Sequence, residues 1–317
     1  MELMRRLVTI FFVLATSGVC LAQPVEQQPE GRWFLAGKDS TRFRLRLGDQ
    51  YMEVDAGLGG RITSLLVDGH DLLTDNTVDA FNWGSTFWPS PQSDWKWPPP
   101  AEIDNEPYTV TLEERRLKMV SKKSPAGLVI TKLISGNVQG NCFLLDYTIT
   151  NMSGKPLTVA PWEITRVKTG GMAFFPMGAG ERKGGLLPLT REKDGIVWFV
   201  YREEGLPSKG DRQLYSDGAE GWLAALNGRT IFVKQFPDIT LEQAAPKEGE
   251  IELYASPLTK SGGYVEIEHQ GAYQVLSPGA SSHWQVTWKI RRIPDSINTQ
   301  AGNPALVDFV RNMVKKN

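Results

Sequence analysis

Side chains that could bind a sugar are concentrated in residues 82–100, which we call the Trp/Pro segment. It holds four of the ten tryptophans of the chain. A pyranose presents an apolar C–H face to an aromatic ring and hydroxyl groups around its edge, so indole rings beside amides and carboxylates suit it. The sugar-binding candidates in this segment are Asn82, Trp88, Asp94, Trp95 and Trp97.

The prolines of the Trp/Pro segment predict an irregular loop, because proline breaks helices and is excluded from central strands. Fixed φ angles lower the entropy cost of presenting side chains to a ligand. We expect Trp95 and Trp97 to be exposed, because they alternate with the charged residues Asp94 and Lys96. The alternative is that the tryptophans fold back and plug an open end of the fold, since large rings are often mostly buried.

A second candidate lies in residues 264–270, which read Tyr-Val-Glu-Ile-Glu-His-Gln. Side chains alternate along a strand, so Tyr264, Glu266, Glu268 and Gln270 share one face. Two neighbouring carboxylates can transfer protons, because a like charge raises the pKa of one of them. This face is either a solvated outer surface or the floor of a polar cleft that uses Tyr264 and Glu268 for binding.

A third candidate lies in residues 159–166, where Glu163 and Arg166 interrupt an apolar strand. They could form a buried ion pair or contact a ligand. In a regular strand the two side chains point to opposite faces, so they serve one cleft only if a bulge intervenes.

Several classes of function are disfavoured. A net charge of -1 provides no field that would attract nucleic acid or anionic lipid. No cysteine or histidine cluster has metal-ligand spacing, and no glycine-rich phosphate loop opens a helix. The three histidines, His70, His269 and His283, lie outside any nucleophile motif. We therefore predict neither a metal nor a cofactor.

The N-terminus has the pattern of an export signal. Arg5 and Arg6 precede a short apolar run, and small residues follow as far as Ala22. We predict a signal peptide over residues 1–22, cleaved after Ala22, and a periplasmic or secreted protein. Lipid anchoring at Cys20 is the alternative, although Val19 stands where a small residue is expected. No later segment is apolar enough to span a membrane.

Short strands separated by Gly, Asn, Asp and Pro predict an all-β sandwich or barrel. In residues 42–47 apolar residues alternate with arginines, which is typical of a half-buried strand. Asn227-Gly228 between two apolar runs predicts a hairpin, because both turn residues need positive φ. The other predicted strands are residues 128–134, 143–150, 196–201, 222–226, 230–236, 251–255, 264–270 and 284–290.

One helix is predicted near the C-terminus. Asn303 can cap it and Pro304 suits its first turn. An apolar stripe then indicates that it packs on the outside of the sheets. We divide the chain into a flexible lead-in over residues 23–40, one β-sandwich domain over 41–293, and a helical extension over 294–317.

Residues 55–65, with their Gly-Gly pair, resemble an early strand and turn of the aldose 1-epimerase (galactose mutarotase) superfamily. Residues 276–279, Leu-Ser-Pro-Gly, resemble the sequence before the last strand of that superfamily. The Trp/Pro segment and residues 161–166 resemble more closely a bacterial family of mutarotase-like proteins of undefined function. The resemblance spans about residues 40–293, and it implies a large antiparallel β-supersandwich with a sugar cleft on its concave face.

The resemblance also implies that Glu266 matches the catalytic glutamate of the superfamily. The histidines that those enzymes use have no counterpart, because the matching strand carries Trp162-Glu163. Our leading hypothesis is a protein that binds a mono- or oligosaccharide and has aldose 1-epimerase-like activity. In it, Glu266 takes the anomeric proton and Glu163, with a pKa raised by burial, protonates the ring oxygen.

In this hypothesis Trp88, Trp95 and Trp97 stack on the sugar, and Asp94 and Arg166 bind its hydroxyls. Three alternatives remain open. The chain could be a non-catalytic glycan-binding module, or a glycoside hydrolase or lyase whose carboxylate pair is Glu163 and Glu266. It could also be an envelope scaffold whose Trp/Pro segment grips a protein partner.

Overall fold

A computed structural model of the chain describes residues 30–38 and 40–315. The predicted signal peptide, residues 1–22, and the first part of the predicted lead-in lie outside the described residues. Within them, no helix has the length and apolar character needed to cross a bilayer.

Eleven strands form the first antiparallel sheet. β5 (His70–Asp71) is attached to β4 and β20 (Gln274–Leu276) is attached to β11. In spatial order the other strands are β1 (Trp33–Leu35), β2 (Arg42–Leu47), β3 (Gln50–Asp55), β4 (Arg61–Val67), β6 (Ser85–Ser90), β11 (Leu157–Lys168), β19 (Tyr264–Gln270), β18 (Ile251–Ala255) and β15 (Gln213–Ser216).

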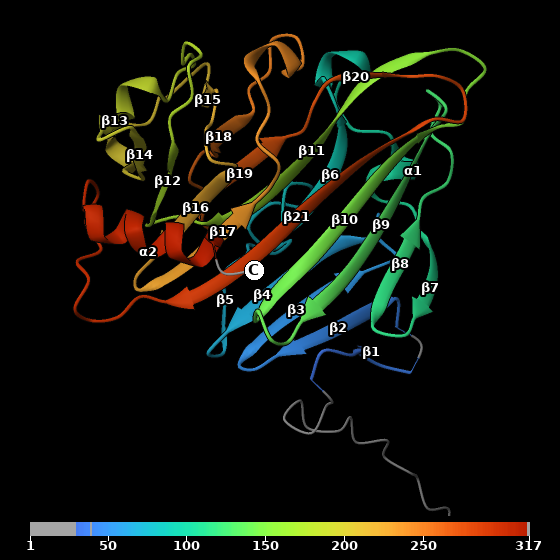
Figure 1. Cartoon of the computed structure of the whole chain (residues 1–317), viewed down its shortest axis with the longest axis horizontal. Helices are drawn as coiled ribbons and strands as arrows, with labels where there is room; N and C mark the ends of the chain where they lie inside the picture. Colours follow the sequence, from blue (N-terminus) through green and yellow to red (C-terminus); the bar gives the residue numbers. More distant parts are fainter. Residues whose placement is uncertain (1–29, 39, 316–317) are drawn as a thin grey trace, which may run out of the picture.

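Ten strands form the second antiparallel sheet, which Figure 1 shows crossing the first one as a separate layer. In spatial order they are β13 (Thr190–Lys193), β14 (Ile196–Val200), β12 (Met172–Pro176), β16 (Trp222–Asn227), β17 (Thr230–Gln235), β21 (Ser281–Arg292), β10 (Cys142–Asn151), β9 (Leu128–Asn137), β8 (Arg116–Val120) and β7 (Thr109–Glu113). The predicted all-β sandwich is therefore confirmed, and each strand predicted from the sequence overlaps an observed one.

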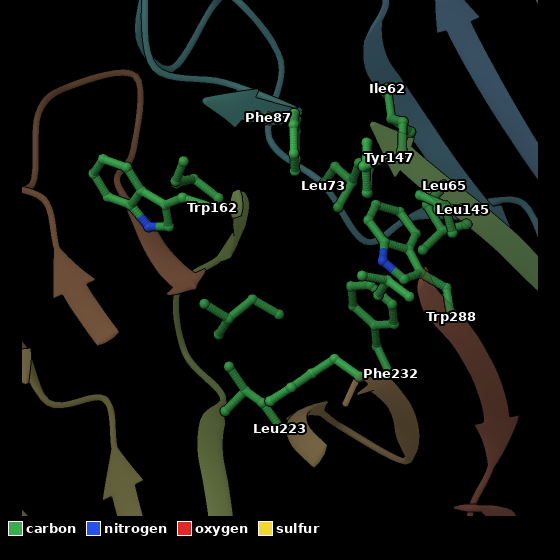
Figure 2. Close-up of a cluster of buried hydrophobic side chains, with 14 of the residues drawn as sticks. Ile62, Leu65, Leu73, Phe87, Leu145, Tyr147, Trp162, Leu223, Phe232 and Trp288 are labelled. Carbon is green, nitrogen blue, oxygen red and sulfur yellow. The ribbon is translucent and has the colours of Figure 1, made fainter. Parts of the chain in front are cut away.

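Most of the main core, part of which Figure 2 shows, fills the space between the two sheets, whereas Trp162 of the same cluster lies on the outer face of the first sheet. Phe87 of the first sheet stacks on Tyr147 of the second with ring centroids 4.1 Å apart. Every second residue of β10 from Phe143 to Ile149 is buried, because alternate side chains of a strand point to the same face. Burying one such large apolar side chain contributes about 1.5–3 kcal/mol of stability.

The C-terminal helix α2 (Pro304–Lys315) covers the outer face of the second sheet, across β12, β16 and β17 (Figure 1). Its Leu306 and Val310 pack with Trp198 and Trp222 in a second apolar cluster. The side chain of Asn303 accepts a hydrogen bond from the backbone N–H of Ala305 at 3.2 Å. The predicted cap and the outside position of the helix are confirmed.

Two local predictions are wrong. The Trp33–Leu35 part of the predicted flexible lead-in pairs with β2 as strand β1. Ser85–Ser90, in the predicted irregular loop, is strand β6. Pro89 fits there because it lies opposite Pro161, so two residues without an N–H meet at one position. β6 also pairs with β4 only at Ser85, which leaves no ladder on that side of Pro89.

Candidate functional site

A pocket of about 320 Å³ lies on the outer face of the first sheet, over β11, β19 and β18. The side chains of β11 show which face of the first sheet carries the pocket. Glu163 points to the second sheet, whereas its neighbours Trp162 and Ile164 point away from it and line the pocket. The pocket is lined by Asn82, Trp88, Gln92, Trp97, Trp162, Ile164, Arg166, Gln213, Tyr254, Tyr264, Glu266 and Glu268.

The pocket brings together residues that the sequence places far apart. Of the ten predicted site residues, those that line it are Asn82, Trp88, Trp97, Arg166, Tyr264, Glu266 and Glu268. The Trp/Pro segment and the polar face of β19 therefore line one hollow. That face is the floor of a cleft and not a solvated outer surface.

Strand register sets the floor of the pocket. On β11 and β19, Arg166 is directly opposite Glu266, and Ile164 is opposite Glu268. On the other side of β19, Tyr254 of β18 is opposite Glu266. Directly opposed side chains on one face lie within contact distance, so this register fixes the Arg166–Glu266 pair.

Arg166 is almost fully buried, and two of its three guanidinium nitrogens have protein partners. Its Nε donates to Oε1 of Glu266 at 2.7 Å, and Nη1 donates to the hydroxyl of Thr86 at 2.7 Å. The guanidinium lies 5.1 Å from the ring centre of Trp88, within the range of a cation–π contact. The pair therefore places a neutralised charge at the base of the pocket.

Glu268 has no cation of its own. Its carboxyl accepts hydrogen bonds from Nε1 of Trp162 at 2.9 Å and from Nε2 of Gln213 at 3.2 Å. Burial raises the pKa of Glu268 to about 8, and the charge of Glu266 adds to the rise, against the opposing influence of Arg166. The surroundings of Glu268 therefore favour its protonated form.

Glu252 lies behind Glu268 as its partner across β18 and β19. It accepts hydrogen bonds from Gln213 at 2.7 Å and from Gln270 at 2.8 Å. Burial raises the pKa of Glu252, and the neighbouring carboxyl of Glu268 raises it further. The amide of Gln213 bridges the two carboxyl groups and fixes the orientation of both.

Tryptophans form one wall of the pocket. Trp88 meets Trp97, Trp95 and Trp162 edge to face, at centroid distances of 6.0, 5.8 and 5.6 Å. Trp97 is 52% exposed, whereas Trp95 is half-buried and donates from Nε1 to the carbonyl of Pro89. Trp88 and Trp95 thus pack as a plug and Trp97 offers its ring to solvent. The expectation that Trp95 is exposed is wrong.

The Gly-Gly turn sets the position of this wall. A side chain on Gly59, whose φ is +62°, would lie 2.0 Å from the carbonyl oxygen of Asp104 in helix α1 (Ala101–Asp104). Glycine there lets α1 approach the sheet. The carboxyl of Asp104 then accepts from Nε1 of Trp88 at 2.9 Å and pairs with Arg61 at 3.2 Å. This anchors the ring of Trp88.

Glu163 lies in the core and not in the pocket, which corrects its predicted role as a proton donor. It is fully buried, 3.0 Å from Nζ of Lys234, and it accepts from the hydroxyl of Tyr147 at 2.6 Å and from Nε1 of Trp288 at 3.0 Å. Burial acts to raise its pKa, but the charge of Lys234 and a hydrogen bond with His269 outweigh burial and lower the pKa. No bulge interrupts the register of β11, so Glu163 keeps its face.

Asp94 also lies outside the pocket lining, in an exposed turn (Gln92–Asp94) of the Trp/Pro segment. None of the three histidines lines the pocket, and His269 is buried on the core face of β19 with its ring stacked on Phe236. In the described residues, no three His, Cys, Asp or Glu side chains gather in an arrangement that could hold a metal ion.

Several polar atoms of the pocket have no partner within residues 30–38 and 40–315. They are Oε2 of Glu266, Nη2 of Arg166, the hydroxyls of Tyr254 and Tyr264, and the side-chain amides of Asn82 and Gln92. Tyr264 is only 4% exposed. None of them is among the described side-chain atoms that are buried without a partner, so they are open to solvent and free to bind a polar ligand in place of water.

Sequence reasoning missed five lining residues, which are Gln92, Trp162, Ile164, Gln213 and Tyr254. Tyr254 could have been found from the sequence. It is two residues from Glu252 in the strand of residues 251–255, so the two side chains share one polar face. Trp162 had no such signal, since apolar residues occupy both faces of β11 and alternation does not separate them.

Comparison with known proteins agrees with this fold. A family model described as a domain of unknown function, DUF4380, matches residues 74–291. A galactose mutarotase-like protein from Lactobacillus casei has a TM-score of 0.55 at 12% identity, with 79% of this chain and 100% of that one covered. A galactose mutarotase related enzyme from Lactobacillus acidophilus has a TM-score of 0.55 at 9% identity, covering 81% of this chain and 99% of that one.

The fold also occurs as part of a longer chain. A TPR-domain containing protein from Parabacteroides distasonis has a TM-score of 0.56 at 14% identity, over 82% of this chain and 49% of that one. The chain thus spans about half the length of that protein. A search of curated proteins found no match. The structural matches establish a galactose mutarotase-like fold.

Proposed function

This chain belongs to the DUF4380 family and has a galactose mutarotase-like fold, and from that premise we propose that it binds a mono- or oligosaccharide in the pocket over β11, β19 and β18. The pocket volume of about 320 Å³ is at the lower end of the range for small-molecule sites. That size suits one sugar unit or the end of a chain.

One observation carries the proposal: a half-exposed indole stands beside polar atoms that have no protein partner. The ring of Trp97 offers an apolar plane for the C–H face of a pyranose. Around it, Oε2 of Glu266 can accept from a hydroxyl, Nη2 of Arg166 can donate to one, and the hydroxyl of Tyr264 can do either. A purely apolar ligand would leave these groups unsatisfied.

Tryptophan fluorescence tests sugar binding, because Trp88, Trp97 and Trp162 all line the pocket. We expect one or more of D-glucose, D-galactose, D-mannose and N-acetyl-D-glucosamine to change the emission in a saturable way. Trp97→Ala should weaken binding about fivefold, the equivalent of about 1 kcal/mol of stacking.

Leu241→Ala is the matched control, since Leu241 is also 52% exposed but lies outside the pocket. It should leave the affinity unchanged. If none of these sugars changes the emission, the carbohydrate proposal is wrong and a scaffold that grips a protein partner is favoured.

We also propose that the protein is exported to the periplasm or beyond, with cleavage after Ala22. The basis is the positive start, short apolar run and small residues of the N-terminal sequence. Mass spectrometry of the protein purified from its native cells should find Gln23 as the first residue. A lipid-modified Cys20 at the N-terminus, or an intact Met1, would contradict this cleavage.

A further inference from the structure

We infer that a cavity between the two sheets binds an uncharged, mainly apolar molecule with one polar end, of the class of medium-chain alcohols. The cavity has a volume of about 370 Å³ and is distinct from the proposed sugar pocket over β11, β19 and β18. Binding in this cavity does not depend on the proposed sugar binding.

Strand register builds one half of the cavity on the inner face of the second sheet. Ala173 of β12 is directly opposite Ala225 of β16. Phe199 of β14 is opposite Ala173, and Phe232 of β17 is opposite Ala225. Directly opposed residues point to the same face, so two methyl groups lie in a row between two phenyl rings. All four side chains line the cavity, and the row forms a trough with aromatic walls.

The first sheet covers this trough. Val167 of β11 is directly opposite Val265 of β19, and both residues line the cavity. They are next in sequence to Arg166 and Glu266, which line the sugar pocket on the other face of the same strands. The cavity and the sugar pocket are therefore separated by the thickness of one sheet.

Small side chains leave the core open at this position. Two residues away on the same inner faces are Phe175 of β12 and Leu223 of β16, and both are fully buried. Ala173 and Ala225 put a single methyl group where those strands otherwise place a large side chain. Protein interiors are normally packed as densely as organic crystals, so an apolar hollow of this size is suited to an apolar guest.

The volume of the cavity limits the size of that guest. An apolar cavity of about 150 Å³ is large enough to bind benzene. At about 370 Å³, this cavity has room for an apolar body of about ten carbon atoms.

Polar side chains at the mouth can hold the polar end of the guest. The hydroxyl of Thr230 and the ring of His70 have no partner in the part of the chain that the structure describes. The amide of Asn227 donates only a long hydrogen bond, of 3.5 Å, to the carbonyl of Thr169. These groups can donate to a hydroxyl group of a ligand or accept from it.

Neither Lys168 nor Asp71, the Lys and Asp of the lining, offers its charge to the cavity. Lys168 is directly opposite Tyr264, which lines the sugar pocket, so its side chain is directed to the outer face of the first sheet. The carboxyl of Asp71 already accepts hydrogen bonds from the hydroxyl of Ser64 and from two backbone N–H groups. Burying a charged ligand here would cost free energy that no counter-charge offsets, so the lining favours an uncharged one.

Displacement of a fluorescent probe tests the inference at about pH 8, where an exposed histidine is uncharged. N-phenyl-1-naphthylamine is neutral, and its emission rises in apolar surroundings. We expect a saturable rise with the wild-type protein and displacement of the probe by 1-octanol. Octanoate should require at least about a tenfold higher concentration, because its carboxylate would be buried without a cation.

A saturable rise is required, and its absence would refute the cavity as a binding site. Equal displacement by octanoate and 1-octanol would overturn the assignment to an uncharged ligand.

Ala225→Leu fills the cavity and should weaken probe binding at least about tenfold, while its thermal melting temperature stays the same or rises. Ala225→Val is the second variant, since a strand accommodates this smaller change readily. Ala305→Leu is the matched control, because Ala305 is exposed on α2 and lies outside the cavity. It should bind the probe as the wild type does. Folded Ala225 variants that bind the probe with wild-type affinity would overturn the inference.

Trp97→Ala separates the cavity from the sugar pocket. Trp97 lines the pocket on the other face of the first sheet, so this variant should bind the probe unchanged. Loss of probe binding in Trp97→Ala would place the probe in the sugar pocket and contradict the inference. Absence of sugar binding with the probe still bound would refute the proposed function and leave the cavity assignment intact.

Discussion

Buried glutamates in this protein occupy two contrasting environments. Glu163 is fully buried beside Lys234 at 3.0 Å and accepts hydrogen bonds from Tyr147 and Trp288. Glu268, on the neighbouring strand, is equally buried but receives only uncharged donors. The cation and the hydrogen-bond donors around Glu163 offset the cost of burying its charge. They favour the ionised form of Glu163, which therefore has a structural role in the core. With uncharged donors alone, burial raises the pKa of Glu268 and favours its protonated form.

Glu163→Gln should destabilise the protein by about 3–5 kcal/mol, because it leaves the ammonium of Lys234 buried without a counter-charge. Urea unfolding followed by circular dichroism measures the loss. The double variant Glu163→Gln/Lys234→Met should lose less than the sum of the two single variants, since it removes both charges. Losses that add independently would mean that the pair does not act as a unit.

At the scale of strands, every strand predicted from the sequence overlaps an observed one, but many strands of the two sheets were not predicted. Residues 42–47 became β2, and residues 264–270 became β19 with the expected common face for Glu266 and Glu268. Alternation also put Glu163 and Arg166 on opposite faces. It did not say which face meets the other sheet, because β11 is buried on both sides.

The errors at this scale come from long-range contacts. Pro89 argued against a central strand, but β6 is possible because Pro161 lies opposite it in a strand that starts almost 70 residues later along the chain. Likewise, the polar face of β19 is the floor of a cleft because side chains of the Trp/Pro segment and Gln213 of β15 line the same pocket. A single sequence contains no local signal for either arrangement.

For the whole molecule, buried titratable groups act on stability in opposite directions as the pH changes. Glu250 accepts hydrogen bonds from the backbone N–H groups of Gly218 and Ile239, and burial raises its pKa to about 7. Burial also lowers the pKa of Lys132 to about 7. A raised carboxyl pKa removes stability as the pH rises, whereas a lowered lysine pKa adds it, so only a comparison of variants isolates one group.

Glu250→Gln should gain stability relative to the wild type as the pH rises from 5 to 8. Below the unfolded pKa of about 4.3 both states of Glu250 are protonated, and between that value and about 7 the folded protein keeps a proton that the unfolded chain has lost. The wild type therefore loses up to about 3 kcal/mol over this range, and glutamine does not. Thermal melts at pH 5, 6.5 and 8 measure the difference, and parallel curves would contradict it.

Substitutions on one face of β11 or β19 are expected to disturb the residues on the other face of the same strand. Trp162 and Glu268 face the pocket, while their sequence neighbours Glu163 and His269 belong to the charge cluster between the sheets. A change on the outer side that shifts either backbone moves that cluster too. Evolution or engineering of a new ligand preference is therefore expected to act through the loop that carries Trp97, leaving the floor strands as a fixed template.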